Sequence, residues 1–218
     1  MYHERGILTC NRARNFYMTL LFSHPLSTYA QSLDHLWLDT SYTLIIGYRD
    51  IVSRLEATLP AAQYNGPGNG VKKPKQNSPA VVELRKSLTR FRQALHSEDT
   101  FYRNLLTRLV AFYQLQPLVS NDLSAVQIPS SEHVENGGPR EGLAPVLPGE
   151  EREKKLGLIY KGLICLGDLE RYKEQYSEKA RKEVREGWRG NGEERFVKAK
   201  MFYEAARRIQ PDNGELML

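Results

Sequence analysis

The chain has 218 residues, of which 40% are hydrophobic and 26% charged, an ordinary globular composition that suffices for one sizeable core. Its net charge of +5 favours an anionic partner only weakly, because mixed charge on helix faces commonly gives such an excess. Two cysteines far apart, Cys10 and Cys165, exclude a disulfide framework and a cysteine metal site.

No targeting or membrane-spanning segment is expected. The densest apolar run near the N-terminus, residues 16–22, is too short to span a bilayer. No small-residue cleavage site follows it, so a signal peptide is not expected either. Together with the two thiols, these features predict an intracellular protein of the cytoplasm and nucleus that has no membrane partner.

The first sixty residues predict one long helix after a poorly defined segment. Within residues 1–31, residues 16–22 can form a short helix that ends at His24-Pro25. Between Ser32 and Leu59, apolar residues recur at steps of three and four, which predicts a helix with Ser32 as its N-cap and Pro60 as its stop. Residues 60–79 are rich in Gly, Pro, Asn and Lys and predict a flexible loop.

The middle of the chain predicts a helical hairpin followed by disorder. One helix is expected over residues 79–96, and Ser97-Glu98-Asp99 is expected to cap a second one. Residues 32–115 would then form the N-terminal part of a helical domain. Residues 116–150 are rich in proline, serine and glycine with little periodicity, and we expect them to be disordered.

The C-terminal part carries the signature of a tetratricopeptide repeat. Leu166-Gly167 matches its first half, and its second half is matched by a small residue, an aromatic, a small residue and a proline, namely Ala199, Tyr203, Ala206 and Pro211. Small residues let two antiparallel helices approach closely, and the aromatic fills the space between them. Residues 151–214 are therefore predicted to form a repeat-like hairpin with a charged insertion at 177–195, followed by a tail at 215–218. The fold class is all-α, and a helical scaffold that binds a partner is favoured over an enzyme.

No catalytic, metal or cofactor motif stands out from the sequence. It lacks a phosphate-binding loop and a local Ser-His-Asp arrangement, and its five histidines have no metal-ligand spacing. Loop lysines, namely Lys72, Lys73 and Lys75, and the aromatic Trp188 can contact nucleic acid or acidic partners, or can simply be solvated. We therefore expect a non-enzymatic protein without a cofactor.

Two arginines are candidates for binding an anion. Arg171 can present a bidentate fork to a phosphate, with the hydroxyl of Tyr172 beside it. The alternative is that Arg171 forms a salt bridge within its own helix, to Asp168, Glu170 or Glu174. Arg49, on the long early helix, can face the same site or be a solvated arginine.

Four segments in order resemble one known family. They are residues 36–49 (Leu-Trp…Tyr…Tyr-Arg), residues 88–105, residues 165–172 (Cys-Leu-Gly-Asp-Leu-Glu-Arg-Tyr) and residues 203–214 (Tyr-Glu-Ala-Ala-Arg…Pro-Asp-Asn-Gly). The family is that of the telomerase-activating, ever-shorter-telomeres proteins and their relatives, the adaptors of nonsense-mediated mRNA decay. The resemblance implies a 14-3-3-like N-terminal domain built from repeat-like hairpins.

The resemblance also implies a function and its residues. In the decay adaptors this domain binds phosphoserine or phosphothreonine on an RNA helicase, and Arg171 with Tyr172 matches the phosphate-binding segment. A lysine expected after the aromatic Tyr42 is replaced by Thr43, which can donate a hydrogen bond but carries no charge, and Arg49 can compensate. The telomerase branch binds telomerase RNA and single-stranded telomeric DNA instead.

This chain departs from the family in two further ways. The insertion at 177–195 separates the halves of the repeat, and the sequence stops at residue 218, where a further helix and a helical-hairpin domain would follow in the family, as in a fragment or shortened member. The first hypothesis is a phosphopeptide-binding adaptor of nonsense-mediated decay. The alternatives are a telomerase-associated nucleic-acid binder and a helical scaffold without a phosphate site.

Overall fold

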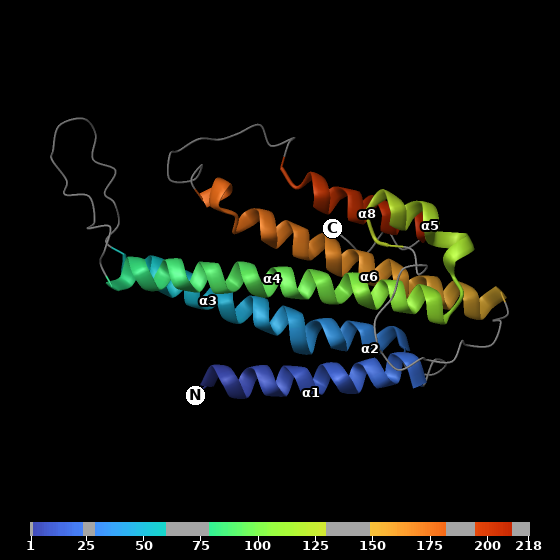
Figure 1. The fold of residues 1–218 in the computed structure, drawn as a ribbon, viewed down its shortest axis with the longest axis horizontal. Helices are drawn as coiled ribbons and strands as arrows, with labels where there is room; N and C mark the ends of the chain where they lie inside the picture. Colours follow the sequence, from blue (N-terminus) through green and yellow to red (C-terminus); the bar gives the residue numbers. More distant parts are fainter. Residues whose placement is uncertain (1, 24–28, 60–78, 130–148, 182–194, 211–218) are drawn as a thin grey trace.

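The fold is a stack of antiparallel helices. The computed structural model describes residues 2–23, 29–59, 79–129, 149–181 and 195–210, and these ranges contain no strand. The helices are α1 (Tyr2–Ser23), α2 (Tyr29–Leu36), the π-helical η1 (Trp37–Tyr42), α3 (Thr43–Thr58), α4 (Pro79–Phe112), α5 (Gln116–Ala125), α6 (Gly149–Gln175) and α8 (Val197–Ile209). In Figure 1 the long helices lie side by side and reverse direction from one to the next. The predicted all-α, repeat-like fold class is confirmed.

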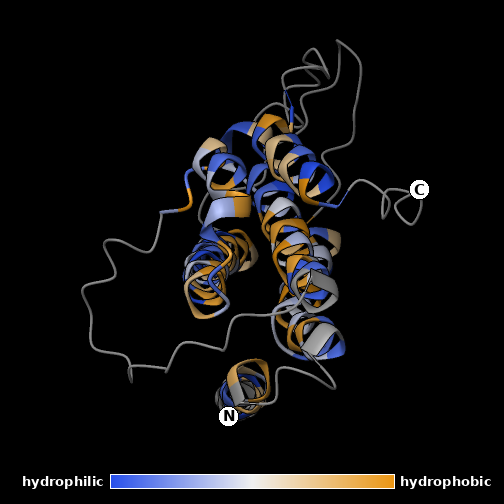
Figure 2. Ribbon diagram, turned by 90° about the vertical axis from the view of Figure 1, so that its right-hand side faces the viewer, coloured by the Kyte–Doolittle hydropathy of each residue, from blue (hydrophilic) through white to orange (hydrophobic). Residues whose placement is uncertain are grey.

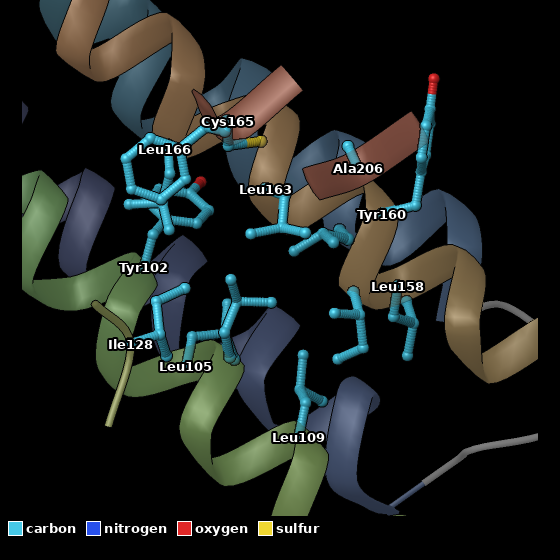
Figure 3. Packing of buried hydrophobic residues seen from close by; sticks show 14 of the residues in the cluster. Tyr102, Leu105, Leu109, Ile128, Leu158, Tyr160, Leu163, Cys165, Leu166 and Ala206 are labelled. Carbon is cyan, nitrogen blue, oxygen red and sulfur yellow. The ribbon is translucent and has the colours of Figure 1, made fainter. Parts of the chain in front are cut away.

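The core lies where α6 packs against both α4 and α8. In Figure 3, Leu105 and Leu109 of α4 face Leu163 of α6, and Ala206 of α8 lies above them; all four are at most 1% exposed. In Figure 2 the helices carry hydrophobic and hydrophilic residues together, as expected for amphipathic helices that each bury one face. Removal of this apolar surface from water is the main stabilising contribution to such a fold.

The contact between α6 and α8 has the geometry that the repeat spacing predicts. Gly167 of α6 lies so close to the ring of Tyr203 that an added Cβ would be 2.4 Å from the Tyr203 Cε1 atom. The two small residues on α8 are buried, with Ala199 2% exposed and Ala206 fully buried. Small residues therefore admit the close approach of the two helices, and the aromatic ring fills the gap beside them.

The predicted hairpin at residues 79–113 is wrong, because α4 is one uninterrupted helix of 34 residues. Ser97-Glu98-Asp99 lies inside this helix and caps nothing. Both carboxylates are buried and paired instead: Arg14 of α1 donates to Glu98 Oε2 at 2.6 Å, and Arg103 donates to Asp99 Oδ2 at 3.0 Å. These cations let two acidic residues remain in the interior of a packed helix.

The helix predicted from Ser32 to Leu59 begins earlier and contains a π-helical turn. Ser32 lies within α2, is 3% exposed and is not its N-cap. In η1 the Thr40 hydroxyl donates to the Leu36 carbonyl, so this side chain satisfies a backbone acceptor near the turn. The C-terminal end agrees with the prediction: α3 ends at Thr58, and Leu59, which precedes a proline, is extended with ψ of 131°.

Two further regions are more ordered than predicted. Residues 1–31 contain the long helix α1, which ends at Ser23. The expected disorder over residues 116–150 is wrong for its first part, where α5 has Pro117 in its first turn and buries Val119 and Leu123. These two apolar side chains are too few to give a recognisable period.

Several predictions fall outside the described residues. These are the loop after Pro60, the remainder of the proline-rich segment at 130–148, and Pro211 with the tail. Of the charged insertion at 177–195, residues 178–181 are helical, and the Ser177 hydroxyl accepts a hydrogen bond from the Ala180 backbone N–H at 3.1 Å. Residues 182–194 lie outside the described ranges.

Candidate anion-binding site

Two arginines from different helices meet at one tyrosine. The guanidinium carbon of Arg171, on α6, lies 4.6 Å from the centroid of the Tyr172 ring, and that of Arg49, on α3, lies 5.7 Å from the same centroid. Both distances are within the range of a cation–π contact. Tyr172 is only 5% exposed, whereas the Arg171 side chain retains 42% exposure. The buried Tyr172 ring is thus a platform that holds two guanidinium groups near solvent.

One carboxylate balances only part of this charge. Arg171 Nη2 donates to Asp168 Oδ1 at 3.1 Å, and the Tyr203 hydroxyl of α8 donates to the same oxygen at 2.9 Å. Arg49, by contrast, pairs with no carboxylate among the described residues. Of the two guanidinium groups at the Tyr172 ring, only that of Arg171 is paired with a carboxylate among the described residues. An anion close to both cations would be stabilised by their positive charge.

The electrostatics of the site follow from this arrangement. Burial by itself lowers the pKa of Arg171, but the adjacent Asp168 carboxylate outweighs it, so the pKa is raised and the group stays charged. Burial and the charge of Asp168 both raise the pKa of Tyr203, so its hydroxyl remains protonated and acts as a donor. Arg171 and Tyr203 therefore both keep their protons across the physiological pH range.

Helix geometry explains why the side chains of α6 gather here. Asp168 precedes Arg171 by three residues and Tyr172 by four, and residues at these spacings are neighbours on a helix surface. The close contact of Gly167 with the Tyr203 ring brings the tyrosine hydroxyl over the same turn. The repeat-like packing therefore supplies a hydroxyl group to a cluster whose charges come from α3 and α6.

The structure brings three of the four predicted residues together. Arg171, Tyr172 and Arg49 form the cluster, whereas Thr43 does not contact it. Thr43 is exposed, and its hydroxyl donates to the carbonyl of Leu38 at 2.7 Å, within the adjoining π-helical segment. Thr43 and Arg49 are six positions apart, which corresponds to a rotation of about 240° around an α-helix, so the two side chains point in different directions.

Two neighbours of the cluster were not identified as site residues from the sequence. The sequence predicts Asp168 only as a salt-bridge partner of Arg171, and that contact is present. For Tyr203 the repeat pattern predicts only the role of packing aromatic. The available signal was that the repeat pattern places Tyr203 against Gly167, next to Asp168, so its hydroxyl must end close to that carboxylate.

The other features singled out in the sequence add no site in the described part of the chain. The loop lysines and Trp188 lie outside the described residues. Among those described, no group of three or more His, Cys, Asp or Glu side chains is arranged to hold a metal ion. None of the described helices combines the length and apolar character needed to cross a bilayer.

Comparison with known proteins gives one match. A family model described as telomerase activating protein Est1 matches residues 31–177, more than half of the chain. The matched residues include Arg49, Asp168, Arg171 and Tyr172 but not Tyr203. No curated protein and no solved structure matches the chain.

Proposed function

The chain belongs to the telomerase activating protein Est1 family, and from this premise we propose that it is a non-enzymatic adaptor that binds a phosphorylated serine or threonine in a partner protein. The proposed partner is the phosphorylated RNA helicase of nonsense-mediated mRNA decay, encountered in the cytoplasm or nucleus. The phosphate would lie against Arg171 and Arg49, with Tyr172 beneath them.

The observation that carries this proposal is the convergence of two arginines from separate helices on one buried ring. A guanidinium group matches the geometry of a phosphate oxygen pair, and two such groups match the double negative charge of a phosphate monoester. Each charge-assisted hydrogen bond would stabilise the complex by roughly 1.5–3 kcal/mol. The absence of a lysine at Thr43 is offset because Arg49 supplies the second positive charge.

A second candidate function is binding of telomerase RNA or single-stranded telomeric DNA. The name of the matching family favours it, and the net charge of +5 is compatible with it. A nucleic acid would contact many cations over a surface rather than one pair, so its binding would depend steeply on salt.

The test is a titration of the purified protein with a fluorescent phosphoserine peptide and its unphosphorylated twin. We expect binding that requires the phosphate, and a loss of affinity of at least about tenfold in either Arg171→Glu or Arg49→Glu, because each removes one charge-assisted contact. Arg208→Glu is the matched control. Arg208 is an exposed arginine of α8 that lies 3.7 Å from Asp122 and outside the cluster, and its substitution should leave affinity unchanged.

Salt distinguishes the two functions. Phosphopeptide binding at one site should weaken only moderately between 50 and 200 mM salt, whereas binding through six to ten nucleic-acid phosphates would fall by roughly 10³–10⁵-fold. Equal affinity for the two peptides, combined with salt-sensitive binding of a single-stranded oligonucleotide, would refute the phosphopeptide function in favour of the nucleic-acid function.

A further inference from the structure

One oxygen of Asp168 serves two partners at the edge of the cluster. It accepts hydrogen bonds from Arg171 Nη2 at 3.1 Å and from the Tyr203 hydroxyl at 2.9 Å. Resting on the phosphate-binding function proposed above, we propose that Asp168 is an internal competitor of the ligand: a carboxylate that occupies Arg171 until a phosphate monoester displaces it. Asp168 would thereby set how strongly an anion must interact with Arg171 in order to bind.

The geometry favours competition because the donors of Arg171 are shared. A guanidinium binds phosphate best when two parallel N–H groups point at two oxygens, and one Nη group of Arg171 already donates to Asp168. The Asp168 side chain is 29% exposed and that of Arg171 42%, so both can reach an incoming ligand. The Tyr203 hydroxyl keeps the carboxylate in place, because it donates to the oxygen that Arg171 uses.

The cost of displacing Asp168 is the same for every ligand that uses Arg171. This common penalty lowers the affinity of every ligand by the same factor. Weakly binding ligands then no longer occupy the site, whereas tightly binding ones still do. A glutamate or aspartate side chain has one negative charge, whereas a phosphate monoester has close to two near neutral pH. The internal carboxylate would thus keep acidic but unphosphorylated peptides from occupying the site.

The decisive variant is Asp168→Asn, which keeps the shape of the side chain and removes its charge. We expect it to bind the phosphoserine peptide about three- to tenfold more tightly than the wild-type protein, since a partly exposed ion pair no longer has to be broken. Affinity for a peptide with glutamate in place of phosphoserine should also rise, by no more than that factor. A gain of affinity cannot arise from damage to the fold.

A matched control is Asp34→Asn. Asp34, on α2, pairs with Lys161, seven residues before Asp168 on α6, so this variant changes the net charge equally without touching the cluster. Its phosphopeptide affinity should stay within about twofold of wild type, as expected for a charge whose interaction with a distant ligand is screened by salt. An equal gain in both variants would reduce the effect to overall charge and overturn the proposal.

A double-mutant cycle tests whether Asp168 acts through Arg171. In an Arg171→Gln background, Asp168→Asn should no longer increase affinity, because the contact that it frees is absent. If Asp168→Asn folds by circular dichroism but binds the phosphopeptide equally or less tightly than wild type, Asp168 is not a competitor. Should the asparagine variant misfold, Asp168→Ser is measured in its place and must show the same gain.

The outcomes separate this proposal from the function on which it rests. If the wild-type protein prefers the phosphorylated peptide but Asp168→Asn does not bind more tightly, only the competitor role fails. If neither protein distinguishes the two peptides, the phosphate-binding function fails and the competitor role with it. Phosphate-dependent binding by the variant alone would support the competitor role. The cost of displacing Asp168 would then be large enough to prevent binding to the wild-type protein.

Discussion

Gly167→Ala tests the close contact between α6 and α8 on which the repeat-like packing depends. The added Cβ would lie 2.4, 2.8 and 2.9 Å from three carbons of the Tyr203 ring, all well inside van der Waals contact. An aromatic ring cannot yield like the end of a flexible side chain. The ring, and with it α8, must therefore move away from α6.

The net effect is a balance of three contributions. Overpacking of this kind costs typically about 1–3 kcal/mol, and loss of the hydrogen bond from Tyr203 to Asp168 adds roughly 0.5–1.5 kcal/mol. Alanine offsets up to about 1 kcal/mol because it has the higher helix propensity. We therefore expect a net destabilisation of about 1–3 kcal/mol, which corresponds to a decrease in Tm of roughly 3–10 °C for a chain of this length.

The chain offers a control for helix propensity. Gly47 is an exposed glycine within α3, and a Cβ at that position meets no atom within 4 Å. Gly47→Ala should raise the free energy of unfolding by about 0.5–1 kcal/mol. Thermal and urea unfolding followed by circular dichroism measure both variants. If Gly167→Ala is as stable as Gly47→Ala, the tight packing of Tyr203 on α6 is wrong.

Three further predictions concern buried groups outside the cluster. Arg14→Ala should lower the free energy of unfolding, measured with urea, by about 3 kcal/mol, because it removes the cation paired with the buried Glu98 carboxylate. The control Arg208→Ala removes an exposed arginine and should lower it by less than about 0.5 kcal/mol. Equal losses in the two variants would contradict the buried pairing. Cys165 is buried and burial raises the pKa of its thiol, so at pH 8 the native protein should react quickly with a thiol reagent at Cys10 and at Cys165 only after unfolding. Because the folded state resists deprotonation of this thiol, stability should also decline as the pH rises above about 8.5; two rapidly reacting thiols in the native protein would contradict the burial.

The sequence predicted best what depends on local spacing. The small and aromatic residues of the repeat, among them Gly167, Ala199 and Tyr203, pack as expected because their complementarity is encoded within two adjacent helices. Arg171 and Tyr172 were identified for the same reason, since both lie in one short segment of α6. For Arg49 the sequence left two alternatives open, the same site or a solvated arginine, because no local spacing relates residues on helices far apart in the chain.

The errors arose where distant residues decide the local structure. Ser97-Glu98-Asp99 has the composition of a helix start, since hydroxyl and acidic side chains favour the first turn. The helix continues through it because Arg14, 84 residues from Glu98, pairs with that carboxylate in the folded state. No local pattern reports such a pairing. The case of Tyr203 is different: the repeat pattern predicts its packing against Gly167, but that pattern describes the ring and says nothing of the hydrogen bond that its hydroxyl donates to Asp168.

The π-helical turn at Trp37–Tyr42 also affects how this chain should be aligned with others. A π-turn within an α-helix behaves as a single inserted residue that the helix absorbs without breaking. Positions counted across Trp37–Tyr42 are therefore offset by one step from those of an uninterrupted α-helix. An alignment with a relative that lacks the turn needs a one-residue gap here, although neither protein has a loop at this place.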